Sequence, residues 1–399
     1  MRVLLYKNLN TKGVKAAFAK VIASLQADDF RSAEVKKLAP SRYWRAKLDY
    51  SNRLLLQFAR YGDETVCLVL EVIENHAYEK SRFLRGSAID EAKIEHEAAL
   101  TEAAQAQPDS PALRWLHATR NEFELLDKPI IFDDAQEAVR RLPPPIVLIG
   151  SAGSGKTAVT LAKLREMEGR VLYVTLSAYL AQSARSLYAA HGYENPAQEV
   201  DFLSYREFME TLRVPPGREL GFSAFAGWYE RHRQAARANL GELDAHAVFE
   251  EFRGVISANP QGPLELHAYL ALGPRQSLLQ PAARQAAHTL FQRYQQWLQE
   301  AHLFDLNLVA WQWQKLAQPL FDFVVIDEVQ DLTNVQLALV LACLKEPGAF
   351  LLCGDSNQIV HPNFFSWAAV RSLFWHGLAG RAAEQQTLSV LRANFRNTR

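Results

Sequence analysis

Hydrophobic positions follow two successive patterns in the first quarter of this chain. Between residues 13 and 38 apolar side chains recur at every third or fourth position, which predicts helical structure. Three runs rich in apolar and β-branched residues follow at 43–48, 54–59 and 65–73, with a Gly-Asp turn signal before the third. Helices followed by an antiparallel meander predict a compact α+β domain over residues 1–88.

A different pattern begins near residue 129, where short apolar runs alternate with helical segments. Such runs predict a parallel sheet covered by helices on both faces. They lie at 146–149, 171–175, 323–326 and 350–352. Strand signals vanish from about 206 to 318, which predicts a helical insertion within an α/β domain over 129–399.

The stretch between these two regions has its own composition. Residues 88–107 are rich in Ala and Glu with few large apolar side chains, and Pro-Asp-Ser-Pro at 108–111 breaks the pattern. We therefore expect a helical linker over 89–128 between the two domains.

Composition and charge narrow the function classes. The 399 residues include 44 basic and 44 acidic side chains and are 49% hydrophobic, which excludes a mainly disordered or coiled-coil chain. Residues 1–90 carry 16 basic and 10 acidic side chains, a net charge of +6, so the remainder carries −6. This asymmetry suggests two units with different roles. Three distant cysteines and the lack of a signal or spanning segment indicate a cytoplasmic protein with no membrane partner.

The strongest chemical motif directly follows the apolar run at 146–149. Residues 150–157 read Gly-Ser-Ala-Gly-Ser-Gly-Lys-Thr and match the phosphate-loop pattern G-x-x-x-x-G-K-[ST] in full. Backbone N–H groups of such a loop and the helix that follows it surround phosphate oxygens. Lys156 would contact the β- and γ-phosphates, and Thr157 would supply an oxygen for Mg²⁺. The alternative is an accidental Gly-rich turn, which the strand–loop–helix context disfavours.

Two further apolar runs end in polar turns. Asp327 and Glu328 follow Phe-Val-Val-Ile, at the strand end where ligands bind in open α/β sheets. Asp327 would hold Mg²⁺, and Glu328 would polarise the attacking water. Gln358 follows Leu-Leu-Cys-Gly-Asp-Ser-Asn and has both a donor and an acceptor with which to sense a γ-phosphate. Taken alone, this Gly-Asp segment is more often an ordinary turn.

In their order, GSAGSGKT, VVIDEVQDL, LCGDSNQ and LRANFRNT resemble the motifs of superfamily 1 helicases of the UvrD/Rep class, over about residues 129–399. The resemblance implies a RecA-like P-loop NTPase domain that uses ATP and Mg²⁺ and acts on single-stranded DNA or RNA. By this match Gln136 would read adenine, Phe395 would stack on it and Arg396 would reach the γ-phosphate. The implied nucleotide contacts are Gln136, Gly150, Gly153, Ser154, Gly155, Lys156, Thr157 and Phe395. The implied catalytic residues are Lys156, Asp327, Glu328, Gln358 and Arg396.

The same resemblance implies contacts with a nucleic-acid strand. Asp-Phe-Leu-Ser-Tyr at 201–205 resembles the family's Thr-Phe-His-Ser-Phe strand contact, which points to Phe202 and Ser204. Phe365 and Trp367 are candidates for stacking on a base, with core packing as the alternative. The sequence stops three residues after Arg396, before the family's second RecA-like domain. We therefore expect a fragment, or a partner that supplies the missing half, and no duplex unwinding by this chain alone.

Residues 1–88 resemble the RelE/ParE toxin-like fold. Tyr-Trp-Arg-Ala-Lys-Leu at 43–48 resembles the strand that carries basic catalytic residues in RelE-type ribonucleases, and Arg45 and Lys47 share one strand face. Together with Arg53, His76 and Tyr78 they would clamp mRNA phosphates and move protons, which implies contact with mRNA or the ribosome. The alternative, which we favour, is a docking or nucleic-acid-binding domain without nuclease activity.

Three functions are therefore open on the sequence. The first is the ATP-binding part of a helicase or translocase with a toxin-like accessory domain. The second is a ribonuclease toxin regulated by an ATP-binding domain. The third is a recruitment module that binds ATP without hydrolysing it.

Overall fold

The computed structural model of the chain divides into two compact units. Unit 1 comprises Met1–Ser110 together with Arg206–Arg218, and unit 2 comprises Pro111–Tyr205 together with Glu219–Arg399. A short segment from the middle of the chain therefore belongs to the N-terminal unit. The structure describes residues 1–7, 9–38, 41–61, 64–90, 93–95, 115–117, 122–125, 128–131, 134–150, 154–190, 195–240, 243–274, 276–355 and 387–391.

Unit 1 is built on a six-stranded sheet with the order β2-β3-β4-β5-β1-β6. Strands β3, β4 and β5 form an antiparallel meander, β1 lies parallel to β5, and β6 pairs antiparallel with β1. Its elements are β1 (Arg2–Tyr6), α1 (Lys15–Gln26), β2 (Lys36–Lys37), β3 (Trp44–Lys47), β4 (Arg53–Tyr61), β5 (Glu64–Ile73), the 3₁₀-helices η1 (Glu74–His76) and η2 (Tyr78–Lys80), β6 (Ile94–Glu95), and α5 (Tyr205–Leu212) from its second residue onward.

The two faces of this sheet have separate cores, because side chains alternate along each strand. On one face Leu54 of β4 packs in a cluster with Ile22 and Leu25 of α1. On the other face Leu55 belongs to a second cluster, and Val214 of the mid-chain segment packs against that cluster. The sheet of unit 1 is thus covered by α1 on one face and contacted by the mid-chain segment on the other.

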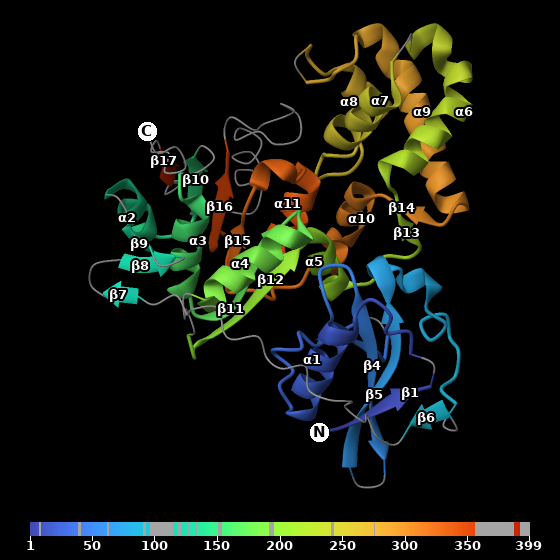
Figure 1. The fold of residues 1–399 in the computed structure, drawn as a ribbon. Helices are drawn as coiled ribbons and strands as arrows, with labels where there is room; N and C mark the ends of the chain where they lie inside the picture. The colour runs from blue at the N-terminus through green and yellow to red at the C-terminus, as the bar shows by residue number, and fades with distance from the viewer. Residues whose placement is uncertain are drawn as a thin grey trace. The chain divides into compact units, whose positions relative to one another are not determined.

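A six-stranded parallel sheet in the order β12-β11-β15-β16-β10-β17 forms the centre of unit 2 (Figure 1). Helices α2, α3 and α4 contribute Val139, Leu161 and Ala184 to a core with Tyr173 and Val325 of the strands. Burial on both faces explains why β10, β15 and β16 are uninterrupted apolar runs. These elements are α2 (Asp134–Arg141), β10 (Ile146–Gly150), α3 (Lys156–Arg165), β11 (Gly169–Thr175), α4 (Ala178–Ala190), β12 (Gln198–Ser204), β15 (Phe323–Ile326), η6 (Val329–Asp331), α11 (Asn334–Leu341), β16 (Phe350–Gly354) and β17 (Thr387–Leu391).

The remaining helices of unit 2 form a bundle with a core of its own (Figure 1). Aromatic rings fill it: Phe225, Phe252 and Tyr294 lie with ring centroids 5.3–5.8 Å apart, distances typical of favourable aromatic pairs. Its elements are α6 (Phe222–Leu240), α7 (Ala245–Glu251), the π-helix η4 (Phe252–Ile256), α8 (Leu266–Leu270) and α9 (Pro281–Glu300). Strands β13 (Arg218–Glu219) and β14 (Leu303–Phe304), helix α10 (Leu306–Trp313) and η5 (Gln314–Leu316) join it to the rest of the chain.

The predicted α/β class is confirmed by this parallel sheet, but two stretches differ from their predicted structure. In the range 89–128, where a helical linker is predicted, the described residues include the strands β6, β7 (Trp115–His117) and β8 (Glu122–Leu125). β8 pairs with β9 (Lys128–Ile131), because Glu-Phe-Glu-Leu alternates polar and apolar residues. The predicted insertion at 206–318 is mainly helical, but its first thirteen residues, Arg206–Arg218, belong to unit 1.

No helix within the described ranges is both long and apolar enough to cross a membrane.

Candidate nucleotide site and a buried charge cluster

The phosphate-loop residues of unit 2 lie at the carboxyl end of β10. Gly150 ends the strand, and the Nζ of Lys156 at the start of α3 donates a hydrogen bond of 2.7 Å to the carbonyl oxygen of Gly150. The lysine is 7% exposed, and the Thr160 hydroxyl one turn later donates to its carbonyl oxygen at 2.7 Å. The loop therefore folds back so that the ammonium group sits against the strand end. Gly153 lies outside the described residues.

Gly155 and Gln136 are in close contact beside Lys156. Gly155 has φ +78°, in the left-handed region, and a Cβ there would lie 2.4 Å from Nε2 of Gln136. That Nε2 donates to the carbonyl oxygen of Ser154 at 3.0 Å. A side chain at position 155 is thus excluded by both backbone conformation and space. Gln136, predicted to read adenine, is buried and contacts the backbone of the phosphate loop.

Asp327 extends from β15 at the same edge of the sheet. The Tyr173 hydroxyl donates to one of its carboxylate oxygens, and the backbone N–H of Glu328 donates to the other at 3.0 Å. Cys353 of the neighbouring strand lies within electrostatic range of both Asp327 and Lys156. Parallel pairing of β10 with β16, and of β16 with β15, therefore brings the predicted phosphate-binding lysine and the predicted Mg²⁺ ligand to one place.

The turn after Asp327 is joined to the end of β16 by one side chain, Gln330. Its Nε2 donates to Glu328 at 2.6 Å, and its Oε1 accepts from the backbone N–H of Asp355 at 3.2 Å. Gly354 permits this approach, because a Cβ there would lie 2.7 Å from the same Oε1. Glu328 itself has φ +50°, a conformation that non-glycine residues rarely adopt and that concentrates at functional sites.

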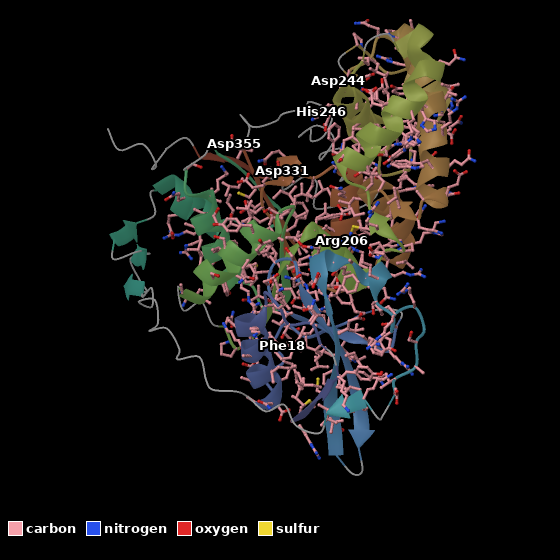
Figure 2. The ribbon with its side chains drawn as sticks, turned by 45° about the vertical axis from the view of Figure 1, so that its right-hand side comes forward. Phe18, Arg206, Asp244, His246, Asp331 and Asp355 are labelled. Carbon is pink, nitrogen blue, oxygen red and sulfur yellow. The ribbon has the colours of Figure 1, made fainter. Side chains whose placement is uncertain are left out.

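Acidic side chains accumulate around this turn, where Figure 2 labels Asp331 and Asp355. Burial raises the pKa of Asp327; the hydrogen bond from Tyr173 opposes this, and the charge of Glu328 adds to it. Burial and the charges of Glu328 and Asp327 likewise raise the pKa of Asp331. Like charges held together in a buried site favour a bound cation, because a cation lowers the cost of ionising every one of them.

The residues present fit a magnesium nucleotide. The hydroxyl oxygen of Ser154 is buried and makes no hydrogen bond with any other described residue, so the phosphate loop retains a donor for an incoming oxygen. Lys156 is placed for the phosphates, while Thr157 and Asp327 offer the oxygen ligands that Mg²⁺ prefers. Gln358, Phe395 and Arg396 lie outside the described residues. Leu391, the first residue of the motif that contains the latter two, pairs in register with Gly150.

The predicted nucleic-acid contacts fall into two groups. The Phe202 ring packs 5.3 Å from the rings of Tyr173 and Tyr188 in the core, so the prediction that it contacts a strand of nucleic acid is not supported. Ser204, also buried, ends β12 at the carboxyl edge of the sheet. Phe365 and Trp367 lie outside the described residues.

The five predicted residues of the RelE-like site converge within unit 1, but they meet carboxylates of α5. Arg53 and Lys47 face each other across β3 and β4, and both approach Glu207: Arg53 through a short hydrogen bond, and Lys47 at 3.1 Å from Nζ to Oε1. Glu210 accepts from His76 Nδ1 at 2.8 Å. It also accepts from the Tyr78 hydroxyl at 3.0 Å and lies 3.7 Å from Nε of Arg45.

We call this set the charge cluster; it comprises Arg45, Lys47, Arg53, His76, Tyr78, Glu207 and Glu210. Both glutamates are 0% exposed. Although burial alone would raise the pKa of Glu210, the hydrogen bond from His76 and the charges of His76 and Arg45 lower it overall. Burial lowers the pKa of Lys47, and the charge of Glu207 opposes that shift.

His76 and Tyr78 lie beyond the end of a strand, in two 3₁₀-helices. β5 ends at Ile73, and the two residues lie in η1 and η2. Asn75 and His76 have φ values of +50° and +54°, a left-handed conformation that cannot continue a strand. The turn brings both side chains back over the sheet toward Glu210.

Sequence reasoning missed the residues that hold Asp327 and the RelE-like residues in place. Tyr173, Glu207 and Glu210 carry no motif. The one available signal for the glutamates is their spacing of three on a helix, which places both on one face next to apolar neighbours.

Two comparisons with known proteins bear on unit 2. The sequence model of an AAA domain family, AAA_19, matches residues 135–363. A human (Homo sapiens) protein named TPR and ankyrin repeat-containing protein 1 is 29% identical over 125 residues. That match covers 29% of this chain and 4% of the human protein, so the chain spans a small part of that relative. AAA_19 is a P-loop NTPase family found in UvrD/Rep-like helicases. Because its model covers more than half of the 399 residues, the chain belongs to the AAA_19 family of AAA domains.

Proposed function

We propose that unit 2 binds ATP with Mg²⁺ and hydrolyses it in response to single-stranded nucleic acid, as the ATP-binding half of a UvrD/Rep-like helicase or translocase. The observation that carries this proposal is the arrangement at one sheet edge: Lys156 after β10, Asp327 after β15 and Asp355 after β16. Three neighbouring parallel strands thereby deliver a phosphate-binding cation, a metal ligand and a further carboxylate to one place.

In this proposal each residue of the site would have a separate role in ATP binding or hydrolysis. Backbone N–H groups near Gly155 and the Nζ of Lys156 would hold the phosphates, which requires Lys156 to exchange the Gly150 carbonyl for a phosphate oxygen. Thr157 and Asp327 would hold Mg²⁺, which neutralises charge on the β- and γ-phosphates. Glu328, fixed by its hydrogen bond from Gln330, would orient the attacking water and take its proton.

Arg396 and Phe395 would complete the site from the end of β17. Support for this comes from the pairing of Leu391 with Gly150, because that register begins the motif beside the phosphate loop.

Lys156→Ala tests the ATPase proposal. Without the ammonium group, phosphate release from ATP measured with and without single-stranded DNA or RNA should fall by at least about 100-fold. Lys315→Ala, which removes an exposed lysine of unit 2, is the matched control and should keep the wild-type rate. Equal rates for wild type and Lys156→Ala would refute the assignment. Tight ATP binding without turnover in the wild type would favour the recruitment module instead.

We also propose that unit 1 is a RelE-like domain whose charge cluster is a phosphate-contacting site. The supporting observation is that five residues chosen from the sequence as a catalytic set converge, although they come from β3, β4, η1 and η2. Cleavage of mRNA by ribosome-bound wild-type chain would support a ribonuclease. Absence of cleavage by both wild type and a variant without the glutamate charges would leave a binding module.

A further inference from the structure

The charge cluster is closed from within the chain. Arg206–Arg218 packs with unit 1, although the chain before and after it belongs to unit 2. Arg206 opens this segment (Figure 2) and pairs with Glu210 at 3.1 Å. The contacts of Glu207 with Lys47 and of Glu210 with His76 place both glutamates on the helix face toward the sheet. The cationic face of unit 1 is therefore covered by a helix that is continuous in sequence with the strand β12 of the ATPase domain.

Without the glutamates of α5, the buried cations of the sheet would repel one another. Lys47 and Arg53 are directly opposite one another on β3 and β4, and like charges in that arrangement repel. Both are buried, so water screens them little. An anion is needed between them, and Glu207 supplies it.

A phosphodiester would meet the same donors. Guanidinium groups bind carboxylates and phosphates through the same paired N–H geometry. Glu207 and Glu210 are three residues apart on one helix face, which places two anionic groups side by side. Donor capacity also remains, because Nε of Arg53 is buried without a hydrogen bond among the described residues.

We propose that α5 is an internal plug, in which Glu207 and Glu210 occupy the places of two backbone phosphates of single-stranded RNA, and that RNA binds the charge cluster only when α5 is displaced. The proposal rests on the RNA-contacting role suggested above for unit 1 and is independent of the ATPase proposal for unit 2. A purely structural ion-pair cluster is the competing explanation, and it predicts no gain of binding when the glutamate charges are removed.

The first experiment removes the competing charges in the full chain. Glu207→Gln/Glu210→Gln keeps the shape of both side chains, and its affinity for a fluorescent single-stranded RNA is measured by anisotropy. We expect binding at least about tenfold tighter than for the wild type, with a steeper salt dependence because more phosphates are neutralised. A single-stranded DNA of the same sequence shows whether the ribose hydroxyls contribute. A folded double variant that binds RNA no tighter than the wild type overturns the proposal.

Two further variants assign the gain to the cluster. Adding Arg53→Gln to the double variant should return RNA affinity to the wild-type level, because the phosphate-binding guanidinium is lost. Glu71→Gln is the matched control: its carboxylate lies on β5 of the same sheet, accepts from the Ser81 hydroxyl at 2.6 Å and stands outside the cluster. It should bind RNA as the wild type does. A gain that survives Arg53→Gln would place the RNA elsewhere and overturn the proposal.

Hydrogen exchange on the wild-type chain provides a test that needs no variant. RNA in large excess should displace α5 and accelerate exchange of the amides of 206–212 by about tenfold or more. Unchanged exchange in that segment overturns the proposal even where the double variant fails to fold. Repeating the anisotropy series in the Lys156→Ala background separates the RNA-plug proposal from the ATPase proposal. The gain in RNA affinity should persist in that background, whether or not ATP turnover is lost.

Discussion

The two sites of this protein use charged residues in opposite ways. In unit 2, Lys156 is held by a backbone carbonyl, Asp327 by a tyrosine hydroxyl and a backbone N–H, and Glu328 by the amide of Gln330. In unit 1, Arg53 and Glu207 form a buried ion pair, and Arg53 also donates to two backbone carbonyl oxygens. Charges supported by neutral partners can turn to a ligand at little electrostatic cost, whereas a buried pair must first be separated. The charged side chains of the unit 2 site can therefore bind a charged ligand, whereas those of the unit 1 cluster already neutralise one another.

Breaking the Arg53–Glu207 ion pair of unit 1 should have the largest effect on stability. Arg53→Ala removes one cation from buried Glu207, which also pairs with Lys47, and loss of one partner of a buried pair costs about 3–5 kcal/mol of stability. Chemical denaturation followed by circular dichroism would measure it. Arg42→Ala removes an exposed arginine of the same unit and should cost no more than about 0.5 kcal/mol. Similar losses for the two variants would contradict the comparison.

Removing a charge from unit 2 should instead affect chemistry more than stability. Glu328→Gln keeps a hydrogen-bonding partner for Gln330 but removes the proposed base, so ATP hydrolysis should fall by about 10²–10³-fold. ATP affinity, measured with a fluorescent analogue, should change by no more than about threefold. Glu346→Gln alters an exposed carboxylate and serves as the control. A loss of affinity as large as the loss of rate would assign Glu328 to binding.

Acid should weaken unit 1 through Glu210. Its pKa is lowered in the folded chain, so its stabilising contribution is present above the ordinary pKa of a glutamate and is lost as the pH falls toward the folded value. In that window each proton taken up costs about 1.4 kcal/mol per pH unit. Unfolding midpoints of unit 1 between pH 5 and pH 3 should therefore fall more steeply in the wild type than in Glu210→Gln. Parallel curves would show that the pair contributes nothing.

The smallest expected effect has the opposite sign. The pKa of Asp327 is raised in the folded chain, so its stabilising contribution is present below the ordinary pKa of an aspartate and is lost as the pH rises through the folded value. Asp327→Asn should therefore stabilise unit 2 near neutral pH by about 1 kcal/mol, or about 2–4 °C in melting temperature, while abolishing ATPase activity. The gain should shrink in acid. Asp322→Asn, which loses an ion pair with Lys345, should lower the melting temperature slightly.

Sequence reasoning could predict the candidate nucleotide site because each of its motifs is local. The phosphate loop is contiguous, and Asp327 directly follows an apolar strand, so residue type and spacing suffice. The environment of the RelE-like residues was not predictable in this way. Arg53 and Glu207 are 154 residues apart, and His76 and Glu210 are 134 apart. No periodicity connects such positions. The placement of His76 past β5 depends on two left-handed residues, Asn75 and His76, which the composition does not signal.

The discontinuity of unit 1 also has a consequence for the time course of its synthesis. Its cationic strands leave the translating machinery long before α5, because 154 residues separate Arg53 from Glu207. At about 5–20 residues per second, the interval lasts about 8–30 s. During that interval the nascent N-terminal sheet must pair its arginines and lysine with outside anions or stay incompletely folded. Unit 1 can therefore finish folding only after residues 206–218 have been synthesised.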